Sequence, residues 1–376
     1  MLALRLVRGT HPVVQLRRLA VAAAAAGVGF LLLCALGYAV GHPTDPSASV
    51  LRLLWCVLPL AATVQFAVAV ARTDPSTRPR PGLSAIGLGP ARLTAVAAAS
   101  TAVSCTLGSA LALLFYLHLR GDLTGLPFDG AAAELLAADQ PVPLAAALTL
   151  LAVVPVTAAT AAALALRPGR PAADTGAGAA GSPGGSAGVL SATPSALPWG
   201  VALLAAGLAV ETYAARGDGG GVLAGWVLTA VGLAMMGPGL THGCGRLLQT
   251  VRPGAVRLLA GRVLMNDARR IGRPLGVVCA VGSGAVAALS LYGGKGVGPL
   301  SWLGAVLVVG CTTATLLTSA LESKQSRART TEALLRLGAP PTVLRTTALL
   351  RAGVLLAVFV PLTWTVGTLA ALPLRG

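Results

Sequence analysis

Residues 19–40 read LAVAAAAAGVGFLLLCALGYAV, an uncharged apolar run of 22 residues. A helix needs about 20 such residues to cross the hydrocarbon core of a bilayer. The run follows four arginines, as a signal peptide would, but the apolar core of a signal peptide is only about 7–15 residues long. We therefore expect a retained first membrane-spanning helix.

Similar runs continue along the rest of the chain. They lie at residues 50–71, 92–117, 143–166, 197–215, 221–241, 274–293, 299–321 and 346–373. The 376 residues are 55% hydrophobic and only 11% charged, which leaves no room for a large domain outside the membrane. An aromatic content of 4% is too low for the aromatic girdles of a transmembrane β-barrel. The sequence predicts an all-α integral membrane protein with nine spans.

The net charge of +16 comes almost entirely from arginine, because only Lys295 and Lys324 among the 28 basic residues are lysines. Such a composition suggests a GC-rich genome, for example that of an actinobacterium. With the N-terminus in the cytoplasm, most basic residues fall in cytoplasmic loops, as the positive-inside rule requires. We expect a multi-pass protein of the cell membrane, and no nucleic-acid partner is needed to explain the charge.

Motifs for catalysis, nucleotide binding and metal binding are missing from the sequence. The string nearest to a P-loop is GGKG at residues 293–296, which lacks the following Ser or Thr. The four histidines are far apart in sequence, and the six cysteines are scattered singly in or beside apolar runs. We expect no cofactor, no metal and no enzymatic activity, and we interpret the cysteines as small core residues.

Ionisable residues inside spans are expensive and are functional candidates by default. Arg52, Glu211 and Arg351 lie within a turn or two of a predicted span end, so we expect them to reach the membrane surface. The eighth span carries a polar stripe that either packs against neighbours or lines a path. Its members are Thr312, Thr313, Thr315, Thr318 and Ser319.

An internal repeat is the most informative feature of the sequence. Residues 83–93, LSAIGLGPARL, precede the third span, and residues 334–344, LLRLGAPPTVL, precede the ninth, 251 residues later. Arg5, Arg17 and Arg18 match Arg257, Arg269 and Arg270 at an offset of 252. Spans one to three then correspond to spans seven to nine. The even number of intervening spans makes this a parallel repeat, although arginine-flanked helices of low complexity also look alike by chance.

The repeat divides the chain into four parts. Residues 1–166 form a first unit of four spans, residues 167–196 a flexible cytoplasmic Gly/Ala/Ser/Pro linker, residues 197–241 two linking spans, and residues 242–376 a second unit of three spans. A counterpart of the fourth span would fall after residue 376.

The repeated loop has the features of a short helix that turns directly into the next span. Gly87 and Gly338 suit a helix C-cap, and Pro90 and Pro341 suit the start of a new helix. Arg336 stands among leucines in an amphipathic pattern. Such a helix could cap the bundle, bind anionic lipid or transmit force from a soluble partner.

The Leu-x-x-Leu/Ile-Gly-(Ala/Leu)-x-Pro pattern ahead of a span resembles the FtsX-like (MacB-type) permeases of ABC transporters. The layout is similar to that of their ten-span bacitracin-resistance type. The resemblance implies coupling to a separate cytoplasmic ABC ATPase, in two copies, through both loops, and export or extraction of a lipophilic or peptide-like substrate. The implied coupling residues are Leu83, Ile86, Gly87, Pro90, Arg92, Leu334, Arg336, Leu337, Gly338 and Pro341.

The chain departs from that family at several points. Ser100 and Arg351 stand where an acidic residue often follows the loop, and the large external domain is reduced to GGKGVG around Lys295. An alternative is therefore a non-transporting scaffold or degenerate permease that regulates a partner. A secondary transporter would need a buried acidic residue that faces a cavity, and we expect every carboxylate to lie at or beyond a span edge.

Overall fold

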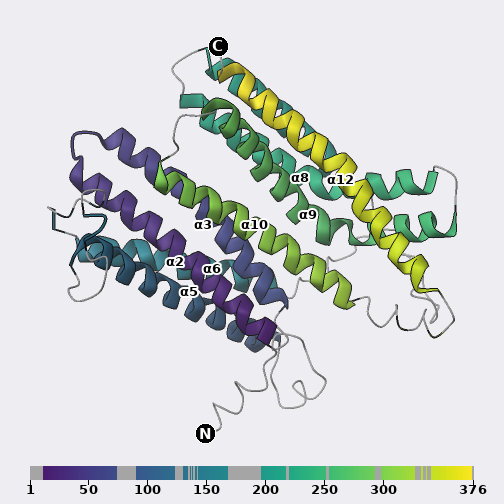
Figure 1. Ribbon diagram of the computed structural model, residues 1–376, viewed down its shortest axis with the longest axis horizontal. Helices are drawn as coiled ribbons and strands as arrows, with labels where there is room; N and C mark the ends of the chain where they lie inside the picture. The colour runs from purple at the N-terminus through teal and green to yellow at the C-terminus, as the bar shows by residue number, and fades with distance from the viewer. Residues whose placement is uncertain are drawn as a thin grey trace, which may run out of the picture. The chain divides into compact units, whose positions relative to one another are not determined.

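Membrane-spanning helices make up nearly all of the described chain. The computed structural model describes residues 12–73, 90–122, 143–167, 196–216, 220–250, 254–292, 298–326 and 340–374, together with residues 130–133, 136, 138, 140, 141, 332 and 336. All regular structure in these residues is helical, and nine of the helices are long and apolar enough to cross a membrane (Figure 1). The predicted class, an all-α membrane protein with about nine spans, is confirmed.

Each expected span coincides with one of these helices. They are α2 (Pro12–Gly41), α3 (Pro46–Thr73), α5 (Pro90–Arg120), α6 (Leu144–Leu166), α7 (Ala196–Ala214), α8 (Gly220–Thr250), α9 (Ala255–Tyr292), α10 (Pro299–Ser326) and α12 (Pro341–Ala371), the last followed by the short 3-10 helix η2 (Leu372–Leu374). Residues 168–195, which make up nearly all of the predicted linker, lie outside the described residues.

Two helices extend well beyond the spans expected from hydropathy. Helix α8 continues to Thr250, and α9 begins at Ala255, far ahead of the expected start at residue 274. The extensions carry most of the arginines of this region, and these charges lower the local hydropathy. The apolar run therefore ends although the helix continues. Pro238 and Pro274 lie inside these helices, and Figure 1 shows α8 and α9 changing direction along their length. Proline removes one backbone hydrogen bond and kinks a helix in this way.

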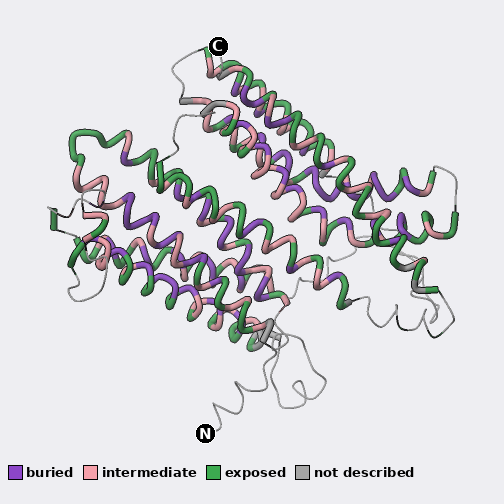
Figure 2. Tube along the Cα trace, in the orientation of Figure 1, coloured by how far each residue is buried: buried purple, intermediate pink, exposed green. Residues whose placement is uncertain are grey.

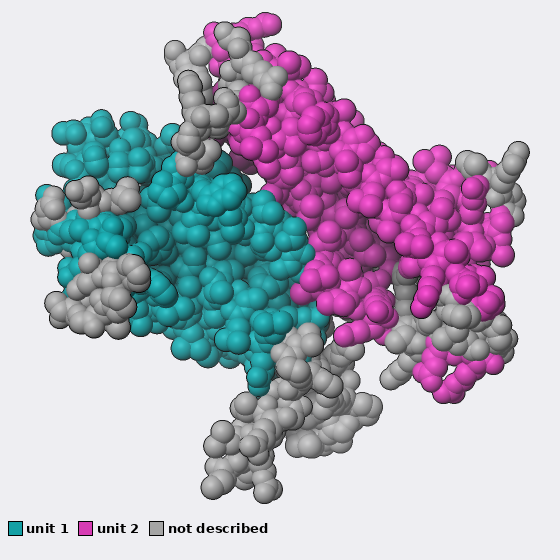
Figure 3. Space-filling view, viewed as in Figure 1, with its two compact units in different colours: residues 1–173, 298–315 teal, residues 174–297, 316–376 magenta. Residues whose placement is uncertain are grey.

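The helices group into two compact units (Figure 3). Unit 1 comprises Met1–Ala173 and Gly298–Thr315, and unit 2 comprises Asp174–Val297 and Leu316–Gly376. The first half of α10 therefore belongs to unit 1. Compactness and internal repetition are different properties, so the repeat boundaries 1–166 and 242–376 stay a prediction.

Unit 1 is built around α2, which packs along α5, α3 and α6. Its core is apolar and consists of two clusters, with Val28 and Leu33 of α2 fully buried and Tyr116 of α5 only 1% exposed. Helix α6 contributes one face of small and aliphatic side chains, and the buried side of each helix is visible in Figure 2. The buried residues of α6 are Ala147, Leu151, Val154, Ala158 and Ala162.

Unit 2 is held together by close approach of helix backbones. Helix α8 packs along both α7 and α9, and α9 packs along α12. A methyl group added at Gly232 of α8 would lie 2.6 Å from the amide nitrogen of Leu204 in α7. One added at Gly276 of α9 would lie 2.7 Å from the carbonyl oxygen of Leu233. Because lipid tails are as apolar as the helices, packing contacts between small residues drive such association.

We predict that Gly232→Ala destabilises unit 2, because the new methyl group overlaps backbone atoms that have no room to yield. Overpacking of this kind costs about 1–3 kcal/mol. Gly243→Ala in the same helix is the matched control, since nothing lies within 4 Å of a methyl group at that position. Thermal unfolding in detergent should occur at a lower temperature for Gly232→Ala and at an equal or higher temperature for Gly243→Ala. Equal melting temperatures for the two variants would contradict the close α7–α8 contact.

Candidate functional site

Only part of each predicted coupling loop lies within the described residues. Leu83, Ile86, Gly87, Leu334, Leu337 and Gly338 lie outside the described residues. Pro90 is the first residue of α5, and Pro341 is the first residue of α12. The prediction that these prolines start the following helices is confirmed, whereas the predicted glycine turns stay a prediction.

The described cations of these loops face solvent. Arg92 in the first turn of α5 is exposed. Arg336 lies in a helical turn, and its Nη2 atom is 2.6 Å from Oε1 of Glu332 four residues earlier, with both side chains mostly exposed. An exposed pair of this kind contributes little to stability. It leaves Arg336 accessible at the surface and fits the predicted amphipathic helix.

The helix pair α2–α5 of unit 1 has a close counterpart in the pair α9–α12 of unit 2. In unit 1, a methyl group on Gly29 would lie 2.9 Å from the Cβ atom of Ala112. In unit 2, a methyl group on Gly282 would lie 2.8 Å from the Cγ2 atom of Thr363. Gly282 follows Gly29 by 253 residues and Thr363 follows Ala112 by 251. These two contacts thus match at the offset of the sequence repeat to within two residues.

A polar contact between the first two helices of each copy also recurs. Arg17 Nη1 of α2 donates to Thr73 Oγ1 of α3 at 3.1 Å, across 56 residues. Ser323 Oγ of α10 donates to Asp267 Oδ2 of α9 at 2.6 Å, also across 56 residues. In both cases one residue lies in the first half of the first helix and the other in the last turn of the second. Equal separations support a common architecture for the two copies.

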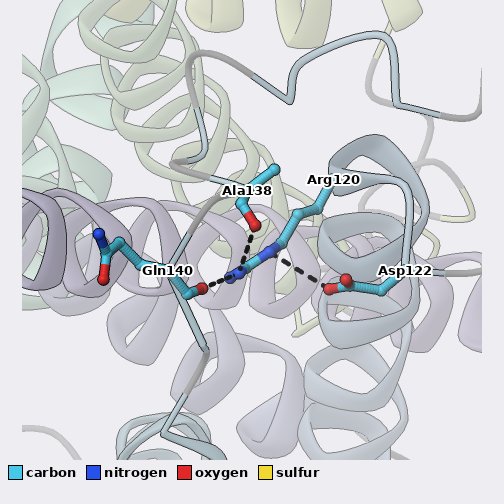
Figure 4. A network of polar contacts seen from close by, with 4 residues as sticks. All are labelled: Arg120, Asp122, Ala138 and Gln140. Carbon is cyan, nitrogen blue, oxygen red and sulfur yellow. Dashed lines mark hydrogen bonds and ion pairs between the residues drawn. The ribbon is translucent and has the colours of Figure 1, made fainter.

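Arg120 at the end of α5 organises the loop that leads to α6 (Figure 4). Its side chain is buried, and Nη2 donates to the carbonyl oxygens of Ala138, at 3.2 Å, and of Gln140. Its Nε atom lies 3.3 Å from Asp122 Oδ2, an ion pair without hydrogen-bond alignment. The sequence alone did not indicate this role of Arg120. The structure shows a clamp between a helix end and its loop.

Glu211 of α7 is a buried carboxyl group, so the expectation that it reaches the membrane surface is wrong. The residue is 1% exposed, and Oε1 accepts a hydrogen bond from Thr229 Oγ1 of α8 at 3.0 Å. Its Oε2 atom is buried with no hydrogen-bond partner among the described residues. The signal in the sequence was a glycine four residues before each polar partner, Gly207 before Glu211 and Gly225 before Thr229, which brings the two helices together at that level.

The other ionisable residues of the spans behave differently. Arg52 is exposed, and its guanidinium carbon lies 3.4 Å from the ring centroid of Tyr38, a cation–π contact near the end of the span. Arg351 is half-buried in α12.

The polar stripe of α10 is largely engaged within its own helix. The hydroxyls of Thr312, Thr313, Thr315 and Ser319 donate to carbonyl oxygens one turn earlier. Back-bonding of this kind satisfies a hydroxyl without any second helix. Both interpretations of the stripe, as a packing surface and as the lining of a path, stay predictions.

The cysteines are all free and buried, which confirms their interpretation as core residues. Groups of three or more His, Cys, Asp or Glu side chains able to hold a metal ion do not occur within the described residues. Comparisons of the chain with protein families, with curated proteins and with solved structures found no match.

We predict that Arg120→Met releases the loop between α5 and α6. Each hydrogen bond to a charged group contributes about 1.5–3 kcal/mol. Loss of two such bonds should therefore raise the population of molecules with an open loop more than ten-fold. Cleavage within residues 121–143 by a broad-specificity protease, mapped by mass spectrometry on detergent-solubilised protein, should accelerate accordingly. Arg216→Met, at an exposed arginine after α7, is the control. An unchanged cleavage rate in Arg120→Met would contradict the clamp.

Proposed function

We propose that this chain is the membrane-spanning permease subunit of an ABC transporter in the cell membrane. It would couple ATP hydrolysis by two copies of a separate cytoplasmic ATPase to the export or extraction of a lipophilic or peptide-like substrate. The observation that carries the proposal is the matched packing of α2–α5 and α9–α12 at the offset of the sequence repeat. Two copies of the repeat with the same orientation in the membrane would offer each of two ATPases an equivalent docking loop.

The proposed coupling elements are the two loops that lead into α5 and α12. A rigid connection favours force transmission, and in each copy the loop passes at a proline directly into a helix of 31 residues. The exposed Arg92 and Arg336 would meet acidic groups of the ATPase. Closure of the ATPases on ATP would push on both loops and move the two copies of the repeat.

The proposed topology predicts where reporter proteins become active. With a cytoplasmic N-terminus and nine spans, a fusion after residue 376 should lie outside and a fusion after residue 250, which follows six spans, should lie inside. Alkaline phosphatase, active only outside, should be active in the first fusion and silent in the second. Green fluorescent protein should give the opposite pattern. The reverse result at both positions would overturn the proposed orientation.

The ATPase partner is tested by purification of the tagged chain from its native membrane with mass spectrometry of what remains bound. We predict a stoichiometric P-loop ATPase, lost in Leu337→Asp and in Ile86→Asp because a buried carboxylate disrupts an apolar docking helix. Leu372→Asp, at an exposed leucine in η2 beyond the opposite end of α12, is the matched control and should retain the ATPase.

Different outcomes separate the proposal from its alternative. Binding of an ATPase together with ATP-dependent movement of a lipophilic probe in proteoliposomes supports a permease. An intact chain that binds an ATPase but moves no probe supports the scaffold or degenerate permease that regulates a partner. An intact chain that retains no ATPase at all overturns the permease proposal.

A further inference from the structure

The buried carboxyl of Glu211 lies where helices α7 and α8 are pressed together. A methyl group on Gly225 of α8 would lie 2.9 Å from the amide nitrogen of Glu211, and one on Gly221 would lie 2.8 Å from the Cβ atom of Ala214. With backbones this close, the side chain of Glu211 has no room to swing outward between the helices. Its 1% exposure therefore follows from the close packing of α7 against α8.

The surroundings of the carboxyl are poor in polar groups. Oε1 has one donor, the hydroxyl of Thr229, and Oε2 has none among the described residues. The neighbouring cluster of unit 2 is apolar and consists of Leu208, Trp226, Ala287, Ala370 and Ala371. The indole nitrogen of Trp226, which follows Gly225, is itself buried without a partner among the described residues. A carboxylate normally accepts several hydrogen bonds, so one hydroxyl falls far short of replacing its hydration.

Apart from the exposed Arg216, five residues after Glu211, the described cations of the packed helices are distant from this carboxyl. Arg246 lies 21 residues from Gly225 in α8, which is about 30 Å along a helix. Arg351 of α12 is 19 residues from Ala370, and Arg273 of α9 is 14 residues from Ala287, which correspond to about 28 Å and about 21 Å. On α7 and its last turn the described charge is Arg216, which is exposed. A buried charge without a nearby opposite charge costs several kcal/mol.

We propose that Glu211 is a proton-binding site inside unit 2, with one proton held on the carboxyl oxygen Oε2. Proton binding converts the carboxylate to a neutral carboxylic acid, and the proton comes from and returns to bulk water when α7 and α8 part. The neutral acid carries no charge to solvate, and its carbonyl oxygen Oε1 keeps the hydrogen bond from Thr229. The α7–α8 pair is therefore an element whose opening is linked to protonation, and this inference does not depend on an ATPase partner.

The experiment uses the full chain in membrane vesicles and a membrane-soluble carbodiimide. A protonated carboxylic acid adds across one C=N bond of the reagent to give an O-acylisourea, which rearranges to a stable N-acylurea with no leaving group. We expect modification at Glu211, located by mass spectrometry, and its loss in Glu211→Gln. Exposed Glu332 is the control within the chain and should react instead with a water-soluble carbodiimide and an amine. Reaction of Glu211 only with the water-soluble reagent would overturn the proposal.

Infrared difference spectra provide a second readout that does not require access of a reagent. Wild type minus Glu211→Gln should contain the carbonyl stretch of a protonated carboxylic acid, whereas the two stretching bands of a carboxylate would overturn the proposal. Thr229→Val removes the one described donor and distinguishes the same two states. If Glu211 is a neutral acid, the yield of folded Thr229→Val protein and its modification by the carbodiimide should stay within about two-fold of wild type. If Glu211 is ionised, the Thr229→Val variant should yield little folded protein.

Discussion

Hydrocarbon offers no hydrogen-bond partner to a peptide group, and this single constraint shapes the whole molecule. Every backbone polar group inside a span must be satisfied within its own helix, which leaves long helices as the solution available to so apolar a chain. The same constraint acts on side chains. Hydroxyls in α10 bond back to their own helix, and Arg120 finds carbonyl oxygens and a carboxylate at a helix end. Glu211 has only the hydroxyl of Thr229 among the described residues.

A second consequence is that small residues rather than large apolar ones set helix contacts. Because exposed leucines on the outer faces gain nothing by leaving lipid, specificity lies where glycines let backbones meet. Gly232 against Leu204 and Gly276 against Leu233 fix α8 between its two neighbours in unit 2. Unit 1 uses the same device more sparingly, since α6 packs through a stripe of alanine, valine and leucine.

The sequence predicted the nine spans because hydropathy depends only on the local run of residues. It did not predict where α8 ends or where α9 begins, since arginines lower hydropathy without ending a helix. Polar residues were harder still. Glu211 is close enough to a span end to reach the surface, but the direction of its side chain depends on Gly225, a residue in another helix. Arg120 is a clamp only because the chain returns to it at Ala138 and Gln140. Of the coupling loops, the sequence correctly placed the helix starts at Pro90 and Pro341.

Repetition and difference between the units have separate physical origins. A contact between the first and third helices of each copy recurs because a glycine on one helix, Gly29 or Gly282, faces a small residue on the other. The second helices differ: α3 packs on α2 within its own copy, whereas the first half of α10 packs in unit 1, with Leu307 against Gly27 and Cys311 near Thr63. Its last turn still bonds to Asp267 of unit 2. Helix α10 thus contributes side chains to unit 1 through its first half and to unit 2 through its last turn.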